Sequence, residues 1–200
     1  MKILILCILA ALLAACTTST PRRVENICHI FEDKRSWYRK AKKAEKRWGS
    51  SISTMMAVIY QESRFQAKAK PPRTKILWLI PGPRKSDAYG YPQAKDATWD
   101  WYKKSSGNRR ADRDDFGDAI DFVGWYNAQT NKNNRVRLND TYNLYLAYHE
   151  GHGGHRRGTY KNKAWLVKVA NRVKSRANTY QQQLQGCEKR LNRGSSILPF

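Results

Sequence analysis

Glu62 is the glutamate of this 200-residue chain whose setting best suits proton-transfer chemistry. The other five glutamates lie in solvated or strongly charged surroundings: Glu25, Glu32, Glu45, Glu150 and Glu188. Glu62 ends a helical pattern that runs from about Ser51 to Ser63, and it falls about 20° from the apolar Met55 around the helix axis. Apolar surroundings and a helix C-terminus both disfavour a carboxylate and raise its pKa, as a general acid requires. The alternative is a solvated glutamate paired with a basic residue.

Three short motifs follow one another along the chain: Glu62-Ser63-Arg64-Phe65, Gly90-Tyr91-Pro92-Gln93-Ala94 and Ala147-Tyr148-His149-Glu150-Gly151. In this order they resemble the signature of family 1 lytic transglycosylases, whose SLT domain has a lysozyme-like fold. The resemblance covers residues 45–180 and is to the membrane-bound lipoprotein type. It implies cleavage of the β-1,4 bond between N-acetylmuramic acid and N-acetylglucosamine in peptidoglycan, without water, to give 1,6-anhydro ends.

The resemblance also implies a role for each matching residue. Glu62 would be the sole general acid and base, and Ser63 would orient the substrate or the carboxyl group. Gln93 would bind the glycan, and Tyr148 would form a hydrogen bond near Glu62. No cofactor is needed. One carboxyl group suffices when no water attacks, whereas ordinary glycosidases use two.

Two motifs depart from the family pattern. His149 and Glu150 stand where the family usually has Asn-Ala, and Tyr91-Pro92 replaces an apolar pair. Two other functions therefore stay open. One is a hydrolytic muramidase that uses water and a second acid, for which the candidates are Asp87, Asp96 and Glu150. The other is a non-catalytic cell-wall-binding lipoprotein.

A cluster of possible metal ligands follows the third motif, namely His149, Glu150, His152 and His155. A zinc-protease helix needs the pattern H-E-x-x-H, and position 153 is glycine. Gly151, Gly153 and Gly154 would also break a helix, so we predict a loop over 151–158 and no metal site. The aromatic residues at helical spacing are expected in the core rather than on sugar rings: Trp99, Trp101, Tyr102, Trp125 and Tyr126.

The charge is strongly positive, because 38 Lys and Arg face 16 Asp and Glu, giving a formal net charge of +22. Such a field attracts polyanions whatever the fold. With 40% hydrophobic residues, the chain can bury one core of ordinary size, which excludes intrinsic disorder. We expect a monomer that binds peptidoglycan glycan strands and the membrane, but no nucleic acid.

The N-terminus has the features of an export signal. Met1-Lys2 precedes the apolar run Ile3–Ala15, which is too short to span a bilayer. Leu13-Ala14-Ala15-Cys16 resembles the bacterial lipobox, so residues 1–15 would be cleaved and Cys16 lipidated. Thr17 is not the aspartate of inner-membrane retention, which favours an outer membrane lipoprotein facing the periplasm. A plain cleaved signal with a chance cysteine is the alternative.

Export leaves Cys28 and Cys187 as a pair in an oxidising compartment, which favours a disulfide over two buried thiols. We expect a lipidated tether over 16–23, one domain over 24–188 and a tail over 189–200.

The hydrophobic pattern predicts a mainly α, lysozyme-like single domain. Helices are expected over Val24–Trp48, Ser51–Ser63, Gln93–Lys104, Asp114–Thr130, Thr141–Glu150 and Lys163–Gln185, the last one ended by Gly186. The Pro-rich segment 71–83 between two of these helices is expected to form a strand pair or an ordered loop over a cleft.

Overall fold

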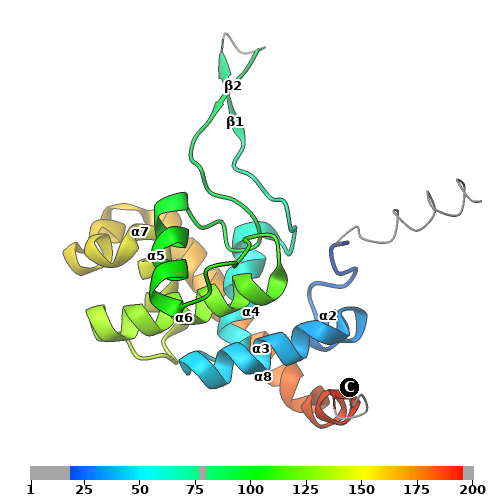
Figure 1. Ribbon diagram of the computed structural model, residues 1–200. Helices are drawn as coiled ribbons and strands as arrows, with labels where there is room; N and C mark the ends of the chain where they lie inside the picture. Colours follow the sequence, from blue (N-terminus) through cyan, green and yellow to red (C-terminus); the bar gives the residue numbers. More distant parts are fainter. Residues whose placement is uncertain (1–18, 77–79, 196–200) are drawn as a thin grey trace, which may run out of the picture.

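Helices make up most of the computed structural model, which describes residues 19–76 and 80–195 (Figure 1). Residues 1–18, including the expected signal and Cys16, lie outside the described residues. The helices are α2 (Ile27–Asp33), α3 (Arg35–Trp48), α4 (Ile52–Ser63), α5 (Asp96–Ser106), α6 (Phe116–Asn134), α7 (Thr141–Arg157), η2 (Thr159–Asn162) and α8 (Ala164–Ser195). The expected mainly α domain is confirmed.

Helix α4 lies at the centre of the fold and carries Glu62 near its end. Ser51 caps its N-terminus by accepting a hydrogen bond from the backbone N–H of Thr54. Every side chain from Ile52 to Ile59 is buried, because α8, α6 and α3 pack around this helix. Burial on all sides, rather than on one face, fixes the position of the helix end.

Several predicted helix boundaries are wrong, and α5 begins at Asp96 rather than at Gln93, whose φ of 49° is left-handed. The helix expected over Val24–Trp48 is two helices, which meet at Lys34, a residue with the non-helical angles φ −119° and ψ 68°. The last helix does not end at Gly186 but continues to Ser195. Leu184 and Cys187 are buried on either side of that glycine, and their packing outweighs the cost of about 1 kcal/mol for glycine inside a helix.

The predicted loop over 151–158 is also wrong, because α7 continues to Arg157. Only Gly151, with φ 73° and ψ 160°, leaves the helical region, and it produces a kink. Contacts with α6 hold the second half of the helix in place. His152 Nε2 lies 3.0 Å from Thr130 Oγ1 and its ring stacks on Tyr126, while Asn134 Nδ2 lies 3.0 Å from His155 Nδ1.

The Pro-rich segment forms a β-hairpin that projects away from the helical body (Figure 1). Strands β1 (Arg73–Ile76) and β2 (Ile80–Arg84) are antiparallel, with Arg73 opposite Arg84 and Ile76 opposite Ile80. Of the two expectations for this segment, the strand pair is therefore the one that the structure has.

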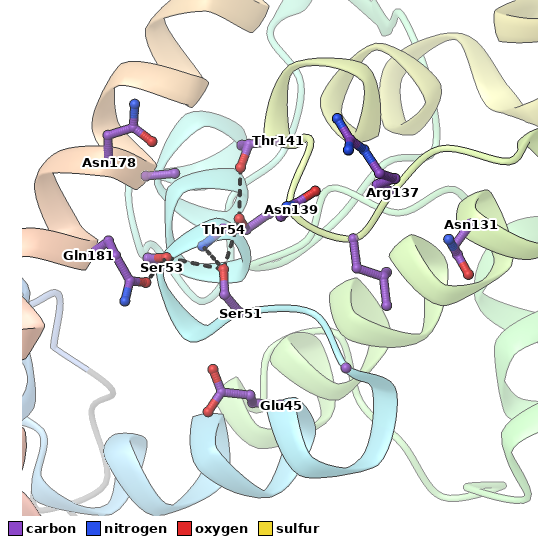
Figure 2. Close-up of a pocket in the computed structure, with 13 residues that line it drawn as sticks. Glu45, Ser51, Ser53, Thr54, Asn131, Arg137, Asn139, Thr141, Asn178 and Gln181 are labelled. Carbon is purple, nitrogen blue, oxygen red and sulfur yellow. Dashed lines mark hydrogen bonds between the residues drawn. The ribbon is translucent and has the colours of Figure 1, made fainter.

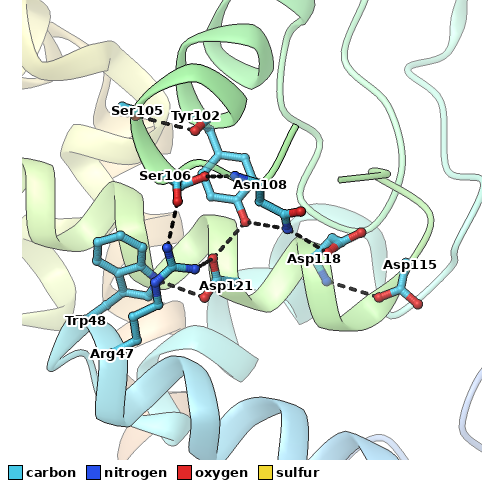
Figure 3. A network of polar contacts seen from close by, with 9 residues as sticks. All are labelled: Arg47, Trp48, Tyr102, Ser105, Ser106, Asn108, Asp115, Asp118 and Asp121. Carbon is cyan, nitrogen blue, oxygen red and sulfur yellow. Dashed lines mark hydrogen bonds and ion pairs between the residues drawn. The ribbon is translucent and has the colours of Figure 1, made fainter. Parts of the chain in front are cut away.

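A polar network joins α3, α5 and α6 on one carboxylate (Figure 3). Asp121 of α6 accepts hydrogen bonds from Trp48 Nε1 at 2.9 Å, from Tyr102 Oη at 2.7 Å and from Arg47 Nη1 at 3.1 Å. The network fixes α5 relative to the core. The expected burial of the aromatic residues is confirmed for Trp99, Tyr102, Trp125 and Tyr126, whereas Trp101 is exposed.

The expected Cys28–Cys187 disulfide is present and joins α2 to α8 across 159 positions of the sequence. Among the described helices, none combines the length and the apolar character that a membrane span needs.

Candidate active site

A cavity of about 570 Å³ opens at the C-terminal end of α4, and Glu62 lies in its wall. Small-molecule sites have volumes of about 300–1,000 Å³, so the cavity is large enough for part of a ligand chain. Residues from α4, α5, α6, α7 and the connection before α5 line it: Glu62, Pro71, Ser86, Ala88, Gln93, Ala94, Lys95, Thr98, Phe122, Tyr126, Tyr148, His149, Glu150 and Gly151. All three sequence motifs therefore contribute to one cavity.

A tight turn after α4 fixes the direction of the Glu62 side chain. Arg64 and Phe65 both adopt left-handed backbone angles, with φ 50° and 61°, which are unfavourable for residues other than glycine. Phe65 is fully buried, and its ring packs against Trp37 and Tyr60. This packing holds the turn, so the helix ends immediately after Glu62 and Ser63.

Burial raises the pKa of Glu62 to about 7, and a hydrogen bond from Tyr145 lowers it only in part. No basic side chain contributes to this shift. The structure therefore rules out the alternative that Glu62 is solvated and paired with a basic residue. With a pKa near neutrality, the group can give and take a proton in turn.

Tyr145 is the site residue that sequence reasoning missed. Its hydroxyl contacts the Glu62 carboxyl group, and burial together with the charge of Glu62 raises its own pKa. The signal was available, because Tyr145 stands three positions before Tyr148 and so lies on the same face of α7.

Tyr148 and Ser63, two other expected site residues, form hydrogen bonds with backbone carbonyl groups rather than with Glu62. Tyr148 lines the cavity, but its hydroxyl donates to the Pro92 carbonyl oxygen at 2.6 Å rather than to Glu62. Ser63 is buried, does not line the cavity, and donates back to the Ile59 carbonyl oxygen at 3.2 Å. The Tyr148 contact joins α7 to the segment before α5, whereas the Ser63 contact lies within the last turn of α4.

Gln93 lines the cavity and also fastens its wall. Its Nε2 donates to the carbonyl oxygens of Ala69 and Gly90, each at 2.9 Å. Gly90 has φ 75°, and a Cβ there would lie 2.2 Å from the Arg113 carbonyl oxygen, so this turn requires glycine. The side-chain oxygen of Gln93 is the part left for a ligand.

Glu150 is the second carboxylate in the cavity wall, and it is ion-paired. Burial alone would raise its pKa, but hydrogen bonds from Lys163, Thr159 and His149 outweigh burial and lower the pKa to about 2. The other two candidates for a second acid do not line this cavity. Asp96 pairs with Arg113 at 2.7 Å, and Asp87 accepts from the backbone N–H of Asp96.

A second cavity, about 700 Å³, lies at the opposite end of α4 (Figure 2). Its polar side chains bond mainly to one another: Thr54 Oγ1 lies 2.7 Å from Thr141 Oγ1, and Ser53 donates to Gln181 Oε1 at 2.8 Å. Glu45 accepts from the backbone N–H of Ile52, at the start of α4. These contacts secure the N-terminus of α4.

Residues 19–76 and 80–195 hold no group of three or more His, Cys, Asp or Glu placed to bind one metal ion. His149 contacts Glu150, whereas His152 and His155 face Thr130 and Asn134 of α6.

The family model of the transglycosylase SLT domain matches residues 4–187. The chain belongs to this family. No curated protein and no solved structure matches the chain. Membership in this family implies a transglycosylase that cleaves peptidoglycan. The cavity at the C-terminal end of α4, which contains Glu62, is the candidate site of that reaction.

Proposed function

We propose that the protein is a lytic transglycosylase that cleaves the bond between N-acetylmuramic acid and N-acetylglucosamine without water. The observation that carries the proposal is a single carboxyl group with a pKa near 7 in the wall of the cavity at the end of α4. A group with this pKa is protonated in part of the population near neutral pH and can act first as acid and then as base.

In the first step, Glu62 gives its proton to the glycosidic oxygen, and the bond from that oxygen to C1 of N-acetylmuramic acid breaks. The carbonyl oxygen of the sugar's own acetamido group bonds to C1 and takes the place of an enzyme nucleophile. In the second step, the Glu62 carboxylate removes the proton from the C6 hydroxyl. O6 then bonds to C1, the bond between the acetamido oxygen and C1 breaks, and a 1,6-anhydro ring closes with Glu62 protonated again.

Neighbouring residues would support these steps. Tyr145 donates to the carboxyl group and would steady it while its charge changes. Gln93 would accept a hydrogen bond from a sugar hydroxyl with its side-chain oxygen, and Tyr148 would hold the segment that contains Pro92 in place. Ser63 would stabilise the last turn of α4, and so the position of the Glu62 carboxyl group, rather than contact the substrate.

A hydrolytic muramidase is the competing function, and Glu150 is the observation in its favour, because it is a second carboxylate in the same cavity. Its ion pair with Lys163, with oxygens at 2.7 and 3.0 Å, argues against a free nucleophile or base. Transglycosylation therefore accounts better for one acid with a raised pKa and one carboxylate held by a lysine.

Mass spectrometry of the muropeptides released from purified peptidoglycan tests the proposal. We expect anhydro-muropeptides from the wild-type protein and none from Glu62→Gln, while Glu150→Gln still gives anhydro products. Reducing-end products that disappear in both variants would establish hydrolysis by two carboxylates. Release by Glu62→Gln at the wild-type rate would refute the assignment of the acid, whereas no release by the wild-type protein or the variant would favour a cell-wall-binding role.

We also propose that the protein is a monomer, anchored to the outer membrane through lipid on Cys16 and facing the periplasm. The support is the lipobox-like sequence Leu13–Cys16, followed by a short segment before α2 begins at Ile27. Membrane fractionation of wild-type and Cys16→Ser cells tests the anchor, because the variant should leave the membrane fraction.

A further inference from the structure

Trp165 is a tryptophan that the proposed reaction does not use. It stands at the start of α8 and is 55% exposed. In the described part of the chain, Trp101 is the other exposed large hydrophobic side chain, at 40%. A single exposed apolar residue is ordinary in itself, so its neighbours decide what it means.

The neighbour of Trp165 is a residue of the active-site cavity. The Trp165 ring lies 5.2 Å from the His149 ring in an edge-to-face arrangement, and His149 lines the cavity that contains Glu62. Trp101 instead contacts Trp125 and His152, neither of which lines that cavity. Only the first of the two exposed tryptophans is therefore joined directly to the cavity wall.

His149 is held in a fixed orientation by Glu150. Its Nδ1 lies 3.0 Å from Glu150 Oε1, and the Glu150 side chain is only 4% exposed. Lys163 and Thr159 bind the same carboxylate. Because an ionised carboxylate only accepts hydrogen bonds, Nδ1 carries the proton in this contact. Nε2, the other ring nitrogen, then has no hydrogen-bond partner among the described residues.

This pair of groups suits a sugar ring. A pyranose has an apolar face, which packs on an aromatic ring, and hydroxyl groups at its edge, which need hydrogen-bond partners. Trp165 offers an exposed indole, and the adjacent His149 Nε2 offers a ring nitrogen that can form a hydrogen bond with a hydroxyl. A glycan strand is a polymer and continues beyond a cavity of about 570 Å³, so the surface next to the cavity wall must meet further sugars.

We propose that Trp165 and His149 form a binding subsite for one hexosamine ring of the glycan strand, at the edge of the cavity that holds Glu62, with Glu150 as the positioning residue. This inference rests on the proposed function, because it takes the glycan strand as the ligand. The subsite contributes to binding and not to proton transfer.

Binding is tested in the Glu62→Gln background, where no cleavage interferes. Isothermal calorimetry measures the affinity of soluble, uncrosslinked strand fragments of alternating N-acetylglucosamine and N-acetylmuramic acid, from disaccharide to octasaccharide. We expect added Trp165→Ala to weaken binding of the long fragments roughly 10-fold, as removal of an aromatic anchor does. Trp165→Phe should restore part of the loss, and Trp101→Ala, the matched control, should bind like the parent.

Three outcomes overturn the subsite. They are equal affinity of the Trp165→Ala and Trp101→Ala variants for every fragment, the same loss with the disaccharide as with the octasaccharide, and no fragment binding at all. Failure of the chemistry would look different. If Glu62→Gln still released muropeptides while Trp165→Ala weakened binding, the subsite would stand and the assignment of the acid would not.

The role of Glu150 is tested by kinetics on soluble strands with active protein. His149→Ala and Glu150→Gln should each raise KM and leave kcat close to the wild-type value, and the double variant should raise KM no further than His149→Ala alone. Such non-additivity indicates that Glu150 acts through His149. Additive effects, or a fall in kcat alone, would refute the positioning role.

Discussion

The raised pKa that suits Glu62 to proton transfer also lowers the stability of the folded protein at high pH. The same burial that raises its pKa to about 7 makes its charged form unfavourable in the folded protein. Below the ordinary pKa of 4.5, the carboxyl group is protonated in both the folded and the unfolded chain. Between these two values the unfolded chain loses the proton first, so the folded state loses stability as the pH rises.

The pH dependence of stability measures this cost. The difference in pKa between 4.5 and about 7 corresponds to about 3 kcal/mol that is present at low pH and lost once the pH exceeds about 7. Glu62→Gln cannot lose a proton, so its advantage over wild type should grow by about 3 kcal/mol between acidic and alkaline solution. Urea unfolding at both pH values checks this, and a constant difference would mean that the carboxyl group is not buried in solution.

At the scale of elements, the kink in α7 positions the third motif. Gly151 separates a segment that places Tyr148 and Glu150 in the cavity wall from a segment that packs on α6. Its angles, φ 73° and ψ 160°, lie in a region that is essentially restricted to glycine.

Two glycines of α7 give a matched pair for testing the kink. A Cβ at Gly151 would meet no atom within 4 Å, so Gly151→Ala would act through backbone strain alone, which we expect to cost about 1–3 kcal/mol of stability. Glycan cleavage should fall as well, because the cavity wall moves. Gly153→Ala should cost nothing or stabilise by up to about 1 kcal/mol, since its Cβ would meet only the movable end of Arg157. Equal behaviour of the two variants in thermal unfolding and cleavage assays would refute this role.

Local signals predicted the helices whose caps and periodicity agree with their packing. Ser51 before α4 and Asp140 before α7 cap as their residue types suggest. Asp115, one position after the expected start at Asp114, caps α6. The signals failed where distant contacts outweigh local preference. Glycines predicted the end of α7 and of α8, but packing against α6 and α2 carries both helices further.

Some features of the candidate site were also predictable from the sequence, whereas others depend on the three-dimensional packing. Periodicity indicated the apolar setting of Glu62, and the resemblance to the transglycosylase family implied that Gln93 and Tyr148, which line its cavity, belong to the site. Spacing did not predict which hydroxyl contacts the acid, because Tyr145 and Tyr148 share a helix face and only the three-dimensional packing separates them. The pairing of Glu150 with Lys163 likewise depends on the turn that brings α8 back to α7.

At the scale of the whole molecule, the Cys28–Cys187 disulfide joins the two ends of the domain. In the chain-entropy model, a loop of 159 residues contributes up to about 5 kcal/mol by restricting the unfolded chain. A reductant should therefore lower the urea midpoint of the wild-type protein by a large margin. The double variant Cys28→Ala, Cys187→Ala should unfold at the lower midpoint with or without reductant, and a midpoint that does not respond in the wild-type protein would contradict the expectation.

The disulfide also makes the folded domain a covalent ring, and the β1–β2 hairpin is the part of that ring which projects farthest from the helical body. A protease that cut the hairpin once would produce two pieces, one with Cys28 and one with Cys187, which stay attached to each other. The helices α2, α3 and α4 would keep their partners α6, α7 and α8 in the same molecule. The ring thus protects the paired halves of the active site from separation when its outermost loop is cleaved.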